Sequence, residues 1–333
     1  MSNIREVAKK ANVSITTVSR ILSGDESFHT TKETKKAVFK AIKDLKYVPN
    51  RKTKLTNIGC ILSITSEKYS DPFFTTILAS CEEEALKHNL NVSQIKHFSE
   101  LSNPLIFQEF INSDLKGLII MEKIPSDTLD IIKKHIPYII YVDYDESLEP
   151  VNTVGFDHRF ADTSVFNYLI DCGYKRIAII SESSPIGDVD DSLRVLAYRE
   201  VLRKNNIKFD DNLIRDCRCD VDECVKQTNE LMKLKNPPDV IFAGSDTLAS
   251  AVIGELNRLG YKCPKDVGVI GFNNLPISLH TNPRLTTVEI PMQEIGKKAI
   301  KRLVELMKGE DSYAEKLSLP TKLIIRDSTR RIK

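Results

Sequence analysis

Apolar residues recur with helical spacing at the start of this 333-residue chain. The first apolar face consists of Ile4, Val7, Ala8 and Ala11, and the second of Val18, Ile21 and Leu22. Asn3 and Ser14 are good N-caps for these two helices, and Asn12 suits a left-handed turn between them. A third helix, over roughly 32–46 behind Thr31, is predicted to close a small core with Val38, Phe39, Ile42 and Leu45.

After Ile58, short apolar runs alternate with helical patterns. The predicted strands are 58–64, 91–96, 117–121, 138–142, 177–181, 240–243 and 267–272. Helical patterns intervene, for example at 77–88, 160–172, 195–205, 248–259 and 293–307. This alternation predicts an α/β body of parallel, doubly wound sheets covered by helices on both faces. Because the strands are too many for one convenient sheet, we expect two similar lobes.

Charge is distributed unevenly along the chain. The formal net charge is only +2. Residues 1–57 nevertheless hold 13 Lys and Arg against 5 Asp and Glu, and the remainder holds 35 against 41. A basic first segment on a mildly acidic body is the electrostatic footprint of a protein that binds phosphates.

Other sequence features exclude several classes of protein. The chain shows neither a signal peptide at Met1 nor an apolar run as long as a membrane span, and its seven cysteines are odd in number, so we expect reduced thiols in a cytoplasm. Cys217, Cys219 and Cys224 lack a standard zinc spacing, and we expect no metal and no other cofactor. We find no nucleophile elbow, no zinc His-Glu motif and only a thin acid–base pair in Asp143 and Asp145, so we do not expect an enzyme.

The second helix carries a short polar face of Ile15, Thr16, Ser19 and Arg20, which suits a DNA major groove. The alternative is an ordinary helical hairpin with a solvated side. The run VAKKANVSITTVSRIL at 7–22, with Tyr47-Val48-Pro49-Asn50, resembles the headpiece of the LacI/GalR family of bacterial repressors. Further motifs recur in the family's order: Asp71-Pro72-Phe73-Phe74, Val154-Gly155-Phe156-Asp157, Val269-Ile270-Gly271-Phe272-Asn273 and Arg326-Asp327-Ser328-Thr329.

The resemblance implies roles for residues of the headpiece and the linker. Ile15, Thr16 and Arg20 occupy base-reading positions, with Arg20 placed for a bidentate contact to guanine. The positions that contact the DNA backbone are Ser14, Thr17, Ser23, His29, Thr31 and Asn50. Residues 50–57 stand where the family has a hinge helix, but they are shorter and more basic than usual. Leu55 could be the minor-groove wedge, and the alternative is a flexible basic tether.

The resemblance also implies a body like that of periplasmic binding proteins. We expect a headpiece at 1–49, a linker at 50–57, an N-terminal lobe at 58–161 plus 289–319, and a C-terminal lobe at 162–288 plus 320–333. Three crossings between the lobes are predicted near Ala161, Val288 and Leu319.

Most of the body motifs follow strands, where open parallel sheets hold ligands. The apolar candidates for contact with an effector are Phe73, Phe74, Phe272 and Met292. The polar candidates are Asp71, Asp157, Arg194, Ser245, Asp246 and Asn273. Three of these have a structural alternative: Asp71 and Asp246 could each serve only to start a helix, and Phe272 could belong to the core. This sequence departs from the family pattern at two positions that bear on the ligand. Asn273 stands where many family members have Asp, and Cys219 stands where the family has an aromatic residue.

These expectations combine into one function. We expect a homodimeric repressor that binds a pseudo-palindromic DNA operator, uses no membrane, and is released by a small sugar between the lobes. The Phe272-Asn273-Asn274 sequence favours galactose or a galactoside, by resemblance to one branch of the family. The alternative is a global carbon regulator of the same family that answers to a phosphoprotein corepressor.

Overall fold

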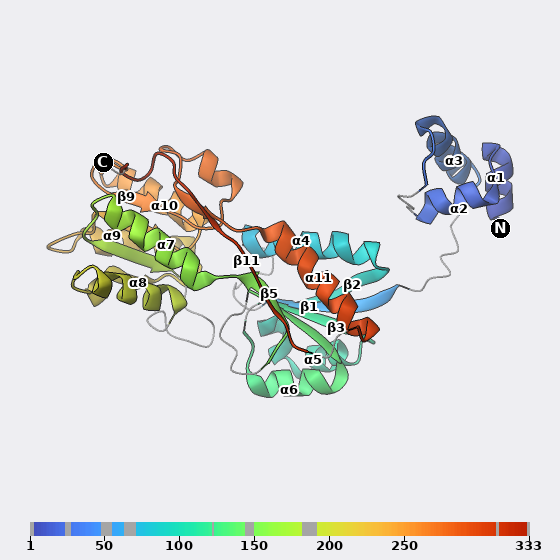
Figure 1. The fold of residues 1–333 in the computed structure, drawn as a ribbon, viewed down its shortest axis with the longest axis horizontal. Helices are drawn as coiled ribbons and strands as arrows, with labels where there is room; N and C mark the ends of the chain where they lie inside the picture. Colours follow the sequence, from blue (N-terminus) through green and yellow to red (C-terminus); the bar gives the residue numbers. More distant parts are fainter. Residues whose placement is uncertain are drawn as a thin grey trace. The chain divides into compact units, whose positions relative to one another are not determined.

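A computed structural model of the chain describes residues 3–23, 28–47, 55–62, 71–121, 123–143, 150–181, 192–310 and 313–331 (Figure 1). The chain divides into two compact units, Met1–Lys54 and Leu55–Lys333, which we call the headpiece and the body. Each unit has a hydrophobic core of its own, so each has what an independent domain needs.

The described part of the headpiece contains three helices: α1 (Ile4–Ala11), α2 (Ile15–Ser23) and α3 (Lys32–Asp44). Asn3 and Glu6 form a capping box, in which the Asn3 side chain accepts a hydrogen bond from the Glu6 N–H at 3.1 Å. Asn12 ends α1 with a left-handed φ of 53°. The predicted caps and the predicted turn between the first two helices are therefore confirmed.

The headpiece core differs from the prediction at one position. Its buried residues are Val7, Ala8, Val18, Val38 and Ala41, with Ile42 and Leu45 partly buried against them. The prediction that Phe39 belongs to this core is wrong, because its side chain is 55% exposed. Consecutive helical residues point about 100° apart, and Val38 and Ala41 already occupy the inward face of α3.

The N-terminal lobe of the body is built on a six-stranded parallel sheet in the order β11-β5-β4-β3-β1-β2. The strands are β1 (Thr56–Leu62), β2 (Leu90–His97), β3 (Gly117–Met121), β4 (Tyr138–Val142), β5 (Thr153–Phe156) and β11 (Lys316–Leu319). Its helices are α4 (Pro72–Lys87), η1 (Phe98–Ser102), α5 (Pro104–Ile111), α6 (Ser126–His135) and α11 (Met292–Lys308). Helix α11 packs against α4 although more than 200 residues separate them, as Figure 1 shows.

The C-terminal lobe is built on a four-stranded parallel sheet in the order β7-β6-β8-β9. The strands are β6 (Ile177–Ser181), β7 (Ile214–Asp216), β8 (Val240–Ala243) and β9 (Gly268–Ile270). Its helices are α7 (His158–Asp171), α8 (Leu193–Lys204), η3 (Asp211–Leu213), α9 (Val221–Met232), α10 (Asp246–Arg258) and η4 (Pro276–Leu279). Short strands β10 (Thr287–Glu289) and β12 (Lys322–Ile324) pair antiparallel beside it. The predicted fold class is confirmed.

The chain passes between the lobes three times. The first passage lies at Asp157, between β5 and α7, and Ala161 is already inside α7. The second lies between β10 and α11, just after the predicted Val288, and the third lies between β11 and β12, beside the predicted Leu319. The linker was predicted to extend to Asn57, but β1 already begins at Thr56 because it pairs with β2 from that residue onward.

The Arg326-Asp327-Ser328-Thr329 motif, which follows the third crossing, is hydrogen-bonded to the C-terminal lobe. The Ser328 hydroxyl donates to the Val269 carbonyl at 2.6 Å and accepts from the Thr286 N–H at 2.8 Å. The Thr329 hydroxyl lies 2.9 Å from that of Thr286 and 2.7 Å from that of Tyr168. These buried polar groups are all hydrogen-bonded, as groups removed from water must be.

Candidate nucleic-acid interface and effector site

Helix α2 presents the predicted base-reading face to the outside of the headpiece. The Ser14 hydroxyl accepts a hydrogen bond from the Thr17 N–H at 2.9 Å, which fixes the start of the helix at Ile15. Ile15, Thr16 and Arg20 are exposed, whereas Val18 is fully buried. Three side chains of different chemistry are therefore available on one short helix.

Several of the predicted phosphate-contacting residues also shape the backbone of α2 and α3. Thr31 caps α3 by accepting from the Thr34 N–H at 3.1 Å, and the Ser23 hydroxyl donates to the Arg20 carbonyl at 3.0 Å. His29 is exposed and Leu55 is partly buried just before β1. Asn50 lies outside the described residues, as does most of the predicted linker.

In the body, a charged pair lies where the first crossing leaves the N-terminal lobe. Asp143 follows β4, and its Oδ1 lies 2.7 Å from Nε2 of His158, the first residue of α7. The His158 ring stacks 3.9 Å from that of Phe156. Burial acts to lower the pKa of His158, but the charge of Asp143 and the hydrogen bond to it outweigh burial and raise that pKa. The site thus favours an imidazolium paired with a carboxylate.

Arg194, at the start of α8, has a side chain that contacts two polar groups and two aromatic rings. Its Nε donates to Asp162 Oδ1 at 3.1 Å, and its Nη1 donates to the Ser181 hydroxyl at 2.6 Å. Its guanidinium carbon lies 4.9 Å from the ring centroids of both Phe242 and Phe272. The Asp162 side chain is 1% exposed and the Arg194 side chain 11%, so this is a buried ion pair.

An aromatic contact joins these two clusters. The rings of Phe156, at the end of β5, and Phe272, just after β9, lie 5.9 Å apart. Side-chain contacts therefore run without a break through Asp143, His158, Phe156, Phe272, Arg194 and Asp162. We call these six residues the junction cluster. It connects the carboxyl ends of strands in both sheets, the edge at which parallel sheets bind ligands.

Two other predicted contacts, Asp71 and Asp157, are helix caps. Asp71 accepts from the Phe73 N–H and Asp157 from the Phe160 N–H, both at 2.8 Å. Asp157 is exposed. The predicted apolar contacts are buried within the main core cluster of the body: Phe73, Phe74, Phe272 and Met292. Their contact with an effector stays a prediction, and it requires these buried side chains to become accessible.

Ser245 and Asp246, which follow β8 at the start of α10, are strongly constrained. Ser245 caps α10, accepting from the Leu248 N–H at 3.3 Å. Asp246 is fully buried; its two carboxylate oxygens accept from the Thr287 hydroxyl and from the Leu275 N–H, both at 2.5 Å. Burial raises the pKa of Asp246 to about 7. This carboxyl holds Thr287 and the backbone at Leu275 in place, and its contact with an effector stays a prediction.

Asn273, the remaining predicted contact, is buried with a left-handed φ of 98°. Asp143, at the corresponding strand end in the other lobe, also has a left-handed φ, of 59°. Non-glycine residues in this region of backbone space are uncommon and often lie at ligand sites.

The sequence did not single out His158, Asp162 or Ser181, and it considered Asp143 only as an acid or base. A usable signal existed for Asp143 and Ser181, because both lie at the carboxyl end of a predicted strand. No signal existed for Asp162, because only the packing of α7 against α8 places it beside Arg194.

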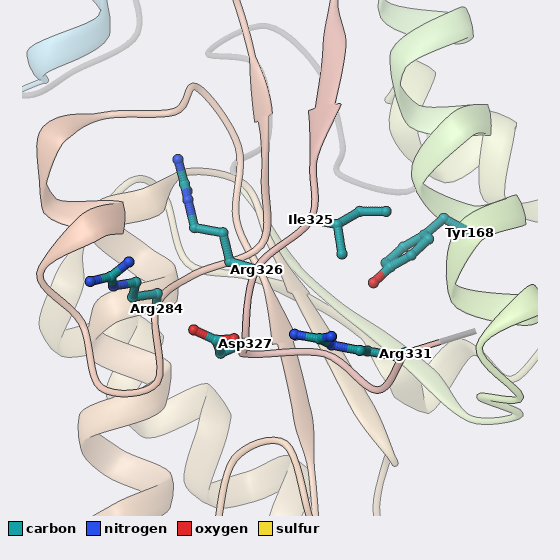
Figure 2. A pocket seen from close by; sticks show the side chains of 6 residues that line it. All are labelled: Tyr168, Arg284, Ile325, Arg326, Asp327 and Arg331. Atoms are coloured by element: carbon teal, nitrogen blue, oxygen red, sulfur yellow. The ribbon is translucent and has the colours of Figure 1, made fainter. Parts of the chain in front are cut away.

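A pocket of about 520 Å³ lies elsewhere in the C-terminal lobe, lined by Tyr168, Arg284, Ile325, Arg326, Asp327 and Arg331 (Figure 2). Figure 2 shows its guanidinium groups pointing in different directions. That of Arg326 donates to the Leu285 carbonyl, the Asn274 side chain and the Ser278 hydroxyl, so it holds the loop after β9. Donors that diverge do not form an anion site.

The cysteines do not form a cluster for a metal. Cys217 and Cys224 are buried in the core of the C-terminal lobe. Within the described ranges, no three His, Cys, Asp or Glu side chains come together in a way that could hold a metal ion. None of the helices in that part of the chain combines the length and the hydropathy of a membrane span.

Comparison with known proteins agrees with this two-unit organisation. Residues 3–50 match the family described as bacterial regulatory proteins, lacI family, and residues 166–329 match the periplasmic binding protein-like domain. The transcriptional regulator CelR, solved as a complex with cellobiose, superposes with a TM-score of 0.73 at 26% identity, over 98% of this chain and 100% of that one.

Two curated relatives extend over almost the whole chain. The NTD biosynthesis operon regulator NtdR of Bacillus subtilis (strain 168) is 30% identical over 338 residues, which cover 99% of this chain and 100% of NtdR. The HTH-type transcriptional repressor CytR of Escherichia coli (strain K12) is 28% identical over 340 residues, which cover 99% of this chain and 97% of CytR. With its helix-turn-helix headpiece and its two-lobed body, this chain belongs to the lacI family of bacterial regulatory proteins, and it is a DNA-binding transcriptional regulator, not an enzyme.

Proposed function

We propose that this regulator is a repressor that binds a pseudo-palindromic operator as a homodimer and is released from it by a small sugar between its lobes. The observation that supports this most directly is the junction cluster, which connects the two sheets through side chains. A ligand inserted there changes contacts in both lobes at once. A coupling of about 1–3 kcal/mol between ligand and operator changes affinity by roughly 5–150-fold.

On DNA, each headpiece of the dimer reads one half-site, because two-fold protein symmetry matches two-fold operator symmetry. We assign the contacts with base edges to Ile15, Thr16 and Arg20, which are exposed on one helix. We assign the contacts with DNA phosphates to Ser14, Thr17, Ser23, His29, Thr31 and Asn50. We assign the contact with the minor groove to Leu55. Such a protein acts in the cytoplasm, where the bacterial operator is.

For the effector, the charges of the junction cluster favour an uncharged sugar over a sugar phosphate. Its two cations, His158 and Arg194, are already paired with Asp143 and Asp162. Asp157 adds an exposed carboxylate at the first crossing, which suits a sugar hydroxyl. The solved complex of CelR contains the uncharged disaccharide cellobiose. Galactose or a galactoside remains our preferred candidate, because Phe272-Asn273-Asn274 resembles the sequence of one branch of the family.

The base-reading assignment is tested by Arg20→Ala. We expect specific operator binding to weaken by about 1–3 kcal/mol, because a bidentate contact to guanine is lost, while salt-dependent binding to random DNA persists. Fluorescence anisotropy with an operator enriched from a random duplex pool measures both. An unchanged preference for that operator over random DNA would refute the assignment.

The effector site is tested by Asp157→Ser, which removes the carboxylate but keeps a residue that caps α7 well. In the wild type, one sugar of a panel should raise the melting temperature and release the operator. The variant should melt at the same temperature without sugar and lose most of the shift with it. A full shift in the variant would place the sugar elsewhere. If no sugar shifts the wild type, the phosphoprotein-controlled alternative is favoured.

A further inference from the structure

We propose that Phe28 is a positioning residue for Arg20, and that it thereby sharpens the selectivity of the headpiece for one operator base pair. The proposal rests on the proposed base-reading role of Arg20, and its test separates the failure of one from the failure of the other. In the headpiece, the Arg20 guanidinium carbon lies 5.4 Å from the centroid of the Phe28 ring, within the range of a cation–π contact.

Phe28 does not contribute to the hydrophobic core of the headpiece. It is only partly buried, and it is not among the residues that form or line the hydrophobic core of the headpiece. An aromatic side chain left on a surface, with a charged side chain over its face, is better explained by that contact than by burial.

Helix ends fix the backbone close to both residues of the contact. Three residues after Phe28, Thr31 accepts from the Thr34 N–H and starts α3. Arg20 belongs to the last turn of α2, where the Ser23 hydroxyl donates to its carbonyl. The contact therefore connects a side chain of α2 to a residue that lies three positions before the N-cap of α3.

The chemistry of the two groups makes this contact compatible with reading a base. A ring binds the flat face of a guanidinium, whereas guanine O6 and N7 are bound by the N–H groups along its edge. A free arginine side chain carries about 2 kcal/mol of rotamer entropy, part of which is lost on binding. A ring that limits its rotamers beforehand lowers this cost. Preorganisation of this kind favours the base pair that matches the fixed position of the donors.

The test uses three substitutions of Phe28 in the full-length protein. Phe28→Ala removes the side chain, Phe28→Leu keeps its apolar bulk without a π face, and Phe28→Tyr keeps the face. Phe39→Ala is the matched control, because Phe39 is an exposed aromatic residue of the same headpiece. Affinity is measured for the enriched operator, for every single-base-pair variant of it, and for random DNA at several salt concentrations. Circular dichroism checks that each variant folds.

We expect Phe28→Ala and Phe28→Leu to lower operator affinity roughly two- to fivefold, the range of an exposed cation–π contact. The loss should appear as weaker discrimination at the one base pair where Arg20→Ala also loses discrimination. Phe28→Tyr should restore it, and Phe39→Ala should change nothing. Random-DNA affinity and its salt dependence should stay the same, and adding Phe28→Ala to Arg20→Ala should cause no further loss.

Three results would overturn the proposal: Phe28→Leu behaving as wild type, an equal loss for all DNA variants, or additive losses in the double variant. If Arg20→Ala itself leaves discrimination intact, the base-reading role of Arg20 fails first, and Phe28 has nothing to position.

Discussion

Replacing Asp162 by alanine is expected to lower the free energy of unfolding of the body by about 3–5 kcal/mol, the usual effect of removing one partner from a buried ion pair. Arg194 would keep its buried position but lose the acceptor of its Nε, 3.1 Å away. Because the guanidinium is enclosed by two phenyl rings, water replaces that acceptor poorly. Urea unfolding followed by circular dichroism measures the loss.

A double variant, Asp162→Leu with Arg194→Leu, is the control for this effect. Replacing both members of a buried pair by apolar residues is often neutral in stability, so most of the lost free energy should return. The double variant should nevertheless remain unresponsive to the effector, since Arg194 is one of its proposed contacts. A single-variant loss below about 1 kcal/mol would show that the pair is well solvated, contrary to its burial.

The second large effect concerns pH and Asp246. Its pKa of about 7 in the folded state lies above the ordinary value of 3.8 because of burial. Well below pH 3.8 both states hold the proton and the buried group brings no penalty. Between pH 4 and 7 the unfolded state ionises first, so the stability contributed by this group falls by about 1.4 kcal/mol per pH unit.

Asp246→Asn isolates this contribution. Its amide can still accept from the Leu275 N–H and donate to the Thr287 hydroxyl, but it cannot ionise. The free energy of unfolding of the wild type minus that of the variant should therefore fall by about 4 kcal/mol from pH 4 to above pH 7, and then stay level. Urea titrations of both proteins over this range give the difference, in which the other groups cancel. A difference independent of pH would mean that the carboxyl is not desolvated.

Much of the fold could be predicted from the sequence. The four strands predicted at 117–121, 138–142, 177–181 and 240–243 have the bounds of β3, β4, β6 and β8. Each is a mainly apolar run; β3, β6 and β8 are buried throughout, and β4 is buried over its last three residues. Such runs are the simplest pattern to recognise. The missed strands are short: β7, β10 and β12 have three residues, and β5 and β11 have four. They are held by pairing with neighbouring strands and are too short for a periodic signal of their own.

The candidate site was predictable only in part. Strand ends indicated where a ligand would bind, and the cap of α4 was one of the two roles predicted for Asp71. The cap of α7 by Asp157 was not predicted. The sequence could not distinguish Phe272 as core or as ligand contact, and the structure places it between two aromatic rings and a guanidinium. Phe39 was misjudged because Val38 and Phe39 are adjacent apolar residues, and only the direction of neighbouring helices decides which one is buried.

By itself, the sequence determined the elements whose causes are local: the capped helices, the left-handed turn at Asn12, the buried strands and the concentration of positive charge before Ile58. Only the tertiary structure decided which charges meet. Asp162 and Arg194 are 32 residues apart, and Asp246 meets Thr287 across 41 residues. Such pairs form because burial removes water from both groups at once, which depends on how helices and sheets pack and leaves no periodic trace along the chain.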